Sequence, residues 1–307
     1  MVLTATLPVF GGAKVVPRSG FGPRLIYLVG GGHGDGSLST SVELYDPQNA
    51  SWTQRAGMAG PRYWHRCVAL DGKLYAVGGL RTANQALDTA EVYDPQTDGW
   101  QPLAKMSTAR GALGLVTVGG KIYAIGGFAG GSTLTLNSVE AYDPQLGAWA
   151  PVASMSGKRR YHASVVLDGK IYVMGGFDGN YLDTVEVYDP QADSWQRVAS
   201  MPQRLHGHTA AAMGGKIYVT GGCNQEPVKS AYVYDPQADA WTQLASMGTA
   251  RKYHASAAVG GKLYVFGGID TRARLGTAEV YDPASDSWAP VPSLTSARRS
   301  FVAVSSL

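Results

Sequence analysis

The sequence of 307 residues has few cysteines, little excess charge and no long apolar run. Cys67 and Cys223 are its only cysteines, which excludes a disulfide framework and is typical of a reducing compartment. The net charge of +3 does not predict a nucleic-acid-binding surface, and no apolar run approaches the roughly 18 to 20 residues of a membrane span. We therefore expect a cytoplasmic or nuclear protein that binds neither nucleic acid nor membrane.

Helical periodicity is also missing, and a repeat takes its place. A Gly doublet, a Tyr-Asp-Pro triplet and a Trp seven residues after that Tyr recur six times, with a period of 46 to 49 residues. Gly175, Tyr188 and Trp195 mark one such unit. A repeat of this length predicts a solenoid or a propeller.

Each unit carries the signals of four strands. Asp168-Gly169 separates two apolar runs and predicts a type I′ hairpin turn. The third strand alternates, with Val185 and Val187 against Thr184 and Glu186, and the fourth is expected from Trp195 to Met201. Four antiparallel strands in six units predict an all-β, six-bladed β-propeller. The Gly doublet would allow close packing, and the Tyr and Trp would fill the space between blades.

The two ends of the chain complete one blade. The first unit lacks the hairpin turn that the other five contain, and the C-terminal segment at about 299–306 has strand character with no partner after it. We expect this segment to be the innermost strand of the first blade, which leaves no open sheet edge. The propeller would then span residues 24–307 as one domain, with residues 1–23 as an N-terminal extension or linker.

These motifs resemble the kelch repeat across residues 24–307. Gly175-Gly176-Phe177-Asp178-Gly179, followed by Thr184 to Pro190, is similar to the kelch domains of BTB-kelch ubiquitin-ligase adaptor proteins. The resemblance implies a protein-binding propeller, which in those adaptors captures the substrate while a BTB domain engages a cullin-based ligase. Other kelch proteins bind actin. No BTB region is present in this sequence.

The strand order predicts two faces with different chemistry. Turns after the first and third strands share one face, which would collect ten of the 23 acidic residues. Loops after the second and fourth strands share the other, and those after the fourth contain no Asp or Glu. An Arg stands in each of these loops, so we expect a ring of six: Arg62, Arg110, Arg159, Arg204, Arg251 and Arg298.

We interpret this loop face as the binding surface for an acidic peptide or protein segment, because Arg and Tyr contribute strongly to interfaces. The candidate partner-binding residues are the six ring arginines and their neighbours Tyr63, Trp64, Arg160, Tyr161, Tyr181, His206, Lys252, Tyr253 and Arg299. Residues that vary between units are the better contact candidates. The alternative is that an Arg repeated in every unit bonds the carbonyl groups of a neighbouring blade.

The loops after the second strands vary in length and chemistry, which suits specificity. Arg81, Tyr181, Asn224, Arg272 and Arg274 could reach a ligand. The acidic side chains in these loops would oppose an acidic ligand or pair with the arginine ring: Asp35, Asp178, Glu226 and Asp270.

Catalytic and metal motifs are largely missing. His65, His162, His208 and His254 occupy equivalent places, but residues in separate blades are too far apart to share one ion. We expect them in the channel wall or core, and we expect no metal, cofactor or catalytic residue. The leading hypothesis is a protein-interaction module acting as a ligase substrate receptor. An actin-binding scaffold is the alternative, and a small-molecule enzyme at the channel mouth is a third possibility.

Overall fold

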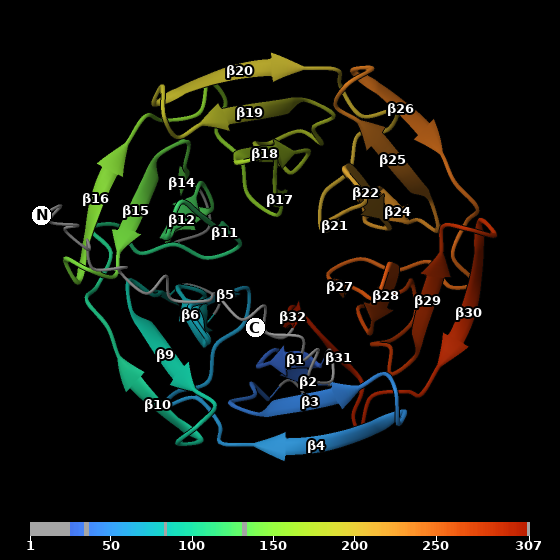
Figure 1. Ribbon diagram of the computed structural model, residues 1–307, viewed down its shortest axis with the longest axis horizontal. Helices are drawn as coiled ribbons and strands as arrows, with labels where there is room; N and C mark the ends of the chain where they lie inside the picture. Colours follow the sequence, from blue (N-terminus) through green and yellow to red (C-terminus); the bar gives the residue numbers. More distant parts are fainter. Residues whose placement is uncertain (1–24, 34–36, 83–84, 131–133, 306–307) are drawn as a thin grey trace, which may run out of the picture.

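Six four-stranded antiparallel sheets stand around a central axis like the blades of a propeller (Figure 1). The computed structural model describes residues 25–33, 37–82, 85–130 and 134–305. The all-β six-bladed prediction is confirmed. The proposed N-terminal extension, residues 1–23, lies outside the described residues. Among the described residues, none forms a helix long and apolar enough to cross a membrane.

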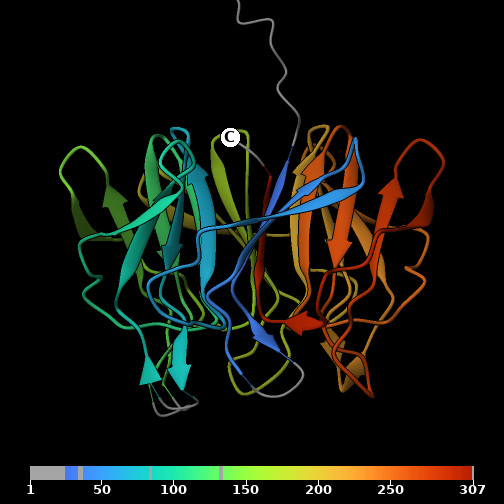
Figure 2. The same cartoon turned by 90° about the horizontal axis from the view of Figure 1, so that it is seen from below.

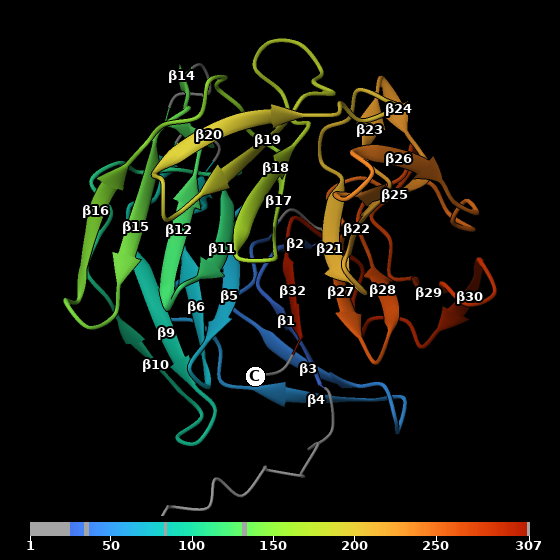
Figure 3. The ribbon, with the colours of Figure 1, turned by 45° about the horizontal axis from the view of Figure 1, so that its top comes forward.

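Blades are numbered 1 to 6 along the chain, and each contributes one strand to each of four concentric layers. The innermost strands surround the channel (Figure 3) and are β32 (Val302–Ser305), β5 (Arg66–Leu70), β11 (Gly114–Val118), β17 (Ala163–Leu167), β21 (Thr209–Met213) and β27 (Ala255–Val259). The second strands are β1 (Ile26–Val29), β6 (Lys73–Val77), β12 (Lys121–Ile125), β18 (Lys170–Met174), β22 (Lys216–Thr220) and β28 (Lys262–Phe266).

The two outer layers carry the Tyr-Asp-Pro and Trp motifs. The third strands are β3 (Val42–Asp46), β9 (Ala90–Asp94), β15 (Val139–Asp143), β19 (Val185–Asp189), β25 (Ala231–Asp235) and β29 (Ala278–Asp282). The outermost strands are β4 (Ser51–Arg55), β10 (Gly99–Pro102), β16 (Ala148–Val152), β20 (Ser194–Val198), β26 (Ala240–Gln243) and β30 (Ser287–Val291). The fourth strand was expected to end at the Met. Instead Met201 lies beyond β20 and is buried in the core.

The chain ends meet in blade 1. β32 pairs antiparallel with β1, with Ile26 opposite Ser305 and Val29 opposite Val302, so the predicted closure is confirmed. The inner strand begins later than expected because Arg298–Arg299 form a separate strand, β31, which pairs with β2 (Gly32–His33). In blades 2, 3 and 5, a short hairpin joins the second strand to the third. These hairpins are β7 (Leu80–Thr82) with β8 (Gln85–Ala86), β13 (Phe128–Ala129) with β14 (Leu134–Thr135), and β23 (Cys223–Asn224) with β24 (Glu226–Pro227).

The hydrophobic core lies between neighbouring blades. One buried cluster joins Ile125 and Val139 of blade 3 to Val173 and Tyr188 of blade 4, with Trp195 packed against it. In each blade the Trp indole lies against the Tyr ring of the third strand, with centroids 4.7 to 5.2 Å apart. Five of the six repeated Trp also donate to a carbonyl of the preceding blade, as Trp195 does to Ala153 at 2.8 Å. The predicted role of these aromatics between blades is confirmed.

Turns and loops separate to opposite faces as predicted, and Figure 2 shows the tight turns at the upper edge and the short hairpins at the lower edge. The turns between first and second strands have positive φ at both central residues, as at Asp168 (51°) and Gly169 (74°). On this turn face, five third-strand aspartates pair with second-strand lysines, as Lys262 does with Asp282 at 2.9 Å. The acidic side chains there are therefore partly neutralised.

Candidate functional site

Five of the predicted ring arginines lie inside the blades. Arg62, Arg110, Arg159, Arg251 and Arg298 are at most 4% exposed. Arg159 donates from Nη1 to the carbonyls of Gly175 and Thr184, at 2.9 and 3.1 Å, and from Nη2 to Glu186 Oε1 at 2.6 Å. The other four form the equivalent ion pairs: Arg62–Glu91, Arg110–Glu140, Arg251–Glu279 and Arg298–Glu43.

These contacts give the five arginines a structural role, since each ties one loop to the next blade through a carboxylate, and four of them also donate to carbonyls of that blade. Their charges are already satisfied, and they do not line the loop face. The expected alternation of the third strand is wrong for Glu186, which is 1% exposed because its carboxylate accepts from Arg159 and from the Ser156 N–H. Burial raises its pKa, but hydrogen bonds from Ser156 and the Arg159 charge outweigh this and hold the pKa below the ordinary value.

The ion pair is missing at one boundary, between blades 4 and 5. Leu205 stands where the other loops have the buried Arg, and Tyr232 stands where the other third strands have Glu. Arg204 is exposed and pairs with Asp183 at 3.3 Å. Sequence reasoning missed these glutamates. The signal was available, since a Glu precedes the repeated Tyr by two residues in every unit except the one whose preceding loop lacks the aligned Arg.

A closed ring of backbone hydrogen bonds surrounds the mouth of the channel on the loop face. Six equivalent residues have φ between 50° and 64°: Trp64, Ala112, Tyr161, Gly207, Tyr253 and Ser300. Each donates its N–H to the carbonyl of its counterpart one blade earlier, over 2.7 to 3.2 Å, and the Trp64–Ser300 bond closes the circle. The left-handed conformation costs a non-glycine residue about 1–2 kcal/mol, which this ring of bonds helps to offset.

Aromatic and small residues alternate around that ring. The Trp64 and Tyr161 ring centroids are 4.9 Å apart, Tyr161 and Tyr253 are 5.5 Å apart, and Trp64 and Tyr253 are 6.1 Å apart. Gly207 makes this possible, because a Cβ there would lie 2.7 Å from the Tyr253 ring. The three aromatic side chains therefore meet over the channel mouth.

His206 and Tyr181 extend these three residues into what we call the aromatic cluster. His206 Nε2 lies 3.0 Å from the Tyr253 hydroxyl, and the Tyr181 ring stacks on the imidazole at 5.0 Å. Two predicted cations contact its edge. Arg160 lies 5.6 Å from the Tyr161 ring centroid, and the Lys252 ammonium lies 5.8 Å from that of Tyr253. The structure thus brings together most of the candidates that vary between units.

Beside the cluster lies a cavity of about 320 Å³, the arginine pocket. Its lining includes Tyr63, Arg81, Arg274 and Arg299, which come from loops of blades 6, 1 and 2. Arg299 and Tyr63 were predicted contact residues, and Arg81 and Arg274 were expected to reach a ligand. Among the described residues that line the pocket there is no Asp or Glu.

The electrostatics of the pocket favour an anion. Burial lowers the pKa of Arg299, and the positive charge of Arg274 lowers it further, while the Tyr253 and Tyr63 hydroxyls act in the opposite direction. A guanidinium stays protonated at neutral pH, so two like charges face each other in a partly buried space. A carboxylate or phosphate between them would relieve that repulsion.

The four aligned histidines line the core and channel, as expected. His65, His162, His208 and His254 are at most 4% exposed. Burial, followed by nearby positive charge, holds the pKa of His162 well below its usual range. In the described part of the chain, no group of three or more His, Cys, Asp or Glu side chains is arranged to hold a metal ion.

Comparisons with known proteins agree with this architecture. A solved chain titled "Structure of YjhT" has a TM-score of 0.72 and 16% identity, over 82% of this chain and 91% of that chain. Similarity at that identity shows the fold alone. No curated protein gives a match. The family described as the KLHDC2/KLHL20/DRC7 Kelch-repeats domain matches residues 21–222 and 199–305. The chain therefore belongs to the KLHDC2/KLHL20/DRC7 Kelch-repeats domain family, whose propeller is a protein-interaction fold.

Proposed function

We propose that this kelch propeller captures an acidic segment of a partner protein on its loop face. The observation that carries the proposal is the convergence of Arg81, Arg274 and Arg299 on one pocket. Arg presents a planar fork that matches a carboxylate. The aromatic cluster lies alongside and offers the Tyr and Trp surface that commonly anchors a bound chain. The five buried ring arginines have no part in this contact surface.

The proposal extends to what the capture of this partner achieves. Similarity to the kelch domains of BTB-kelch adaptors supports a role as substrate receptor of a cullin-type ubiquitin ligase. The propeller would supply substrate capture, and a BTB domain elsewhere in the same polypeptide or in a partner would supply the ligase contact. The position of the arginine pocket, on the face opposite the Lys–Asp pairs, leaves the turn face available for other contacts.

The pocket is tested by titrating a fluorescent peptide of about ten residues rich in Glu and Asp. We expect Arg81→Glu/Arg299→Glu to weaken binding at least tenfold, because two of the three pocket cations are reversed in sign. The wild-type affinity should also fall with added salt. Arg204→Glu is the matched control, since Arg204 is exposed on the same face but outside the pocket. Equal affinity of the pocket variant and the control would exclude the pocket.

An actin-binding scaffold remains the alternative function, supported only by kelch resemblance. Co-sedimentation with actin filaments separates the two functions. Sedimentation that is unchanged in Arg81→Glu/Arg299→Glu would favour the scaffold and place its contact elsewhere on the blades.

A further inference from the structure

A second cavity lies within the channel, behind the aromatic cluster. It has a volume of about 130 Å³ and is formed by the first residues of the innermost strands, including Arg66, Ser164, Thr209 and Ser256. Towards the turn face it continues into a wider section of about 320 Å³ with mainly Val and Ala walls. Towards the loop face only about 10 Å³ of space remains beneath Trp64, Tyr161 and Tyr253.

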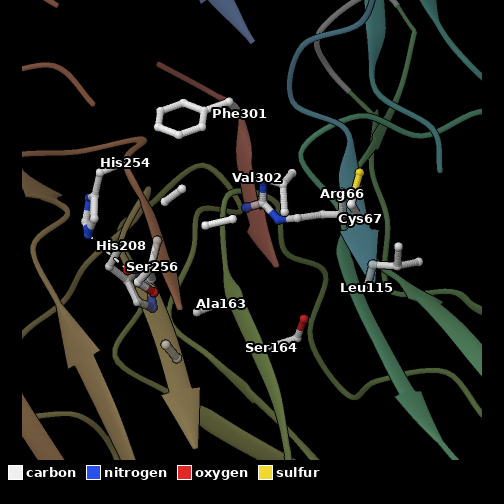
Figure 4. A pocket seen from close by; sticks show the side chains of 14 residues that line it. Arg66, Cys67, Leu115, Ala163, Ser164, His208, His254, Ser256, Phe301 and Val302 are labelled. Carbon is white, nitrogen blue, oxygen red and sulfur yellow. Dashed lines mark hydrogen bonds between the residues drawn. The ribbon is translucent and has the colours of Figure 1, made fainter. Parts of the chain in front are cut away.

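In the described part of the chain, one charged side chain enters this channel. Arg66 is the only Arg, Lys, Asp or Glu among the described residues that line the three sections. The equivalent positions in the other blades hold uncharged residues: Gly114, Ala163, Thr209, Ala255 and Val302. Figure 4 shows the Arg66 side chain reaching from β5 into the cavity, with His208 and His254 on the opposite wall. Arg66 donates to the His65 carbonyl at 3.3 Å, which leaves most of its five N–H groups for another acceptor.

The other polar groups of the cavity are neutral. Burial and neighbouring positive charge depress the pKa of His208 to about 3 and that of His254 well below its usual range. Burial raises the pKa of the Cys67 thiol. The hydroxyls of Ser164 and Ser256 line the same space and can donate hydrogen bonds. The Arg66 side chain is partly buried, and the described lining of the cavity contains no carboxylate to pair with its guanidinium.

We propose that the channel cavity binds a small oxyanion on Arg66, with Ser164 and Ser256 as hydroxyl donors. The shared chemistry is a compact anionic group of oxygen atoms, either inorganic phosphate or sulfate or the carboxylate of a small acid. The volume suits this size, since 130 Å³ is several times the roughly 10–15 Å³ that a single water molecule needs. The aromatic cluster closes the loop-face end, so the anion would enter from the turn face. This site is separate from the arginine pocket and does not depend on the proposed function.

Thermal unfolding of the whole chain tests the site. At fixed ionic strength, we expect 20 mM phosphate or sulfate to raise the wild-type Tm by about 2–4 °C, because the ligand binds only the folded state. Arg66→Met should abolish the shift and melt at or above the wild-type temperature without anion, because it removes an unpaired charge. An acetate series separates a carboxylate preference from an inorganic one. Arg299→Met is the matched control, in which a cation is removed from the arginine pocket and the shift should persist.

Two outcomes would overturn the proposal. Equal anion-dependent shifts in wild type and Arg66→Met would show a general salt effect, and a shift lost in Arg299→Met but kept in Arg66→Met would place the anion in the arginine pocket. Crystals grown with selenate give an independent readout. An anomalous selenium peak at hydrogen-bonding range of the Arg66 guanidinium supports the site, and a channel without one contradicts it.

Discussion

At the scale of single residues, the Gly doublets are required both by the close packing of neighbouring atoms and by the backbone conformation. A Cβ on Gly175 would lie 2.7 Å from His208 Cε1 and 2.7 Å from the Leu205 carbonyl of the next loop. The second Gly of the pair packs in the same way against His162 of its own blade. The absence of side chains at the doublet therefore leaves the space that a histidine and the next loop occupy. This confirms the predicted close packing.

Two glycines with the same φ separate backbone strain from packing. Gly119 and Gly175 both have φ of 59°, but a Cβ on Gly119 would meet nothing within 4 Å. We expect Gly119→Ala to lower the free energy of unfolding by about 1–2 kcal/mol, the cost of the left-handed conformation. Gly175→Ala should cost at least about 2 kcal/mol more, because the methyl overlaps backbone atoms. Urea denaturation measures both, and equal losses would show that packing around the doublet is unimportant.

At the scale of elements, neighbouring blades are held together by polar links, and at two boundaries both halves of a link are replaced. Asp98 accepts from the Tyr93 hydroxyl of its own blade and from the Ala56 N–H of the preceding one, at 2.6 and 3.0 Å. At the boundary between blades 6 and 1, the corresponding residues are Ala50, which has no carboxylate, and Pro292, which has no N–H. At the boundary between blades 2 and 3 only one half of this link is replaced, since Gly147 takes the place of the Asp and Ala104 keeps its N–H. In the buried ion pair, Leu205 and Tyr232 replace the Arg and the Glu together. Half of a buried polar link costs more than none.

Restoring the missing ion pair tests that rule. Leu205→Arg alone should lower the free energy of unfolding by about 3–5 kcal/mol, since it puts a guanidinium at a fully buried position without a carboxylate. Adding Tyr232→Glu should recover most of this loss. Urea denaturation of both single variants and the double variant gives the coupling energy, and strictly additive effects would contradict a paired role.

At the scale of the whole molecule, closure depends on two circular features. β32 supplies the inner strand of blade 1, and the six backbone bonds from Trp64 round to Ser300 join every blade at the loop face. The four aligned histidines, His65, His162, His208 and His254, belong to the same inner circle, in which Leu113 and Phe301 take the equivalent places in the other two blades. A neutral imidazole is therefore used there as a core side chain.

This arrangement predicts a loss of stability in weak acid. Each buried histidine has a folded pKa below the usual 6.5, about 3 for His208, so the unfolded chain takes up protons first as the pH falls below 6.5. Between pH 6.5 and 5, above the range of the carboxylates, each should lower the free energy of unfolding by up to ~1.4 kcal/mol per pH unit.

The comparison is wild type against His208→Phe and His208→Leu, which copy the residue types of Phe301 and Leu113. The pKa of the buried His206 is also lowered, to about 4, so five histidines contribute to the pH dependence. Urea denaturation at each pH should therefore give a slope smaller by about one fifth in either variant. An unchanged slope would show that His208 remains accessible to protons in the folded protein.

The sequence by itself determined the architecture, because the Gly doublet, Asp-Gly turn, Tyr and Trp act through local geometry and repeat with a fixed period. It also placed Tyr63, Tyr253 and Arg299 on the correct face. Only the tertiary structure decided which arginines are buried in contacts between blades. Arg159 and Arg160 are adjacent in sequence, yet one is buried against Glu186 of the next blade and the other lies against aromatic rings at the channel mouth. That difference depends on how neighbouring blades pack, since the partners lie many residues apart in the chain and charge pairing requires both to meet in space.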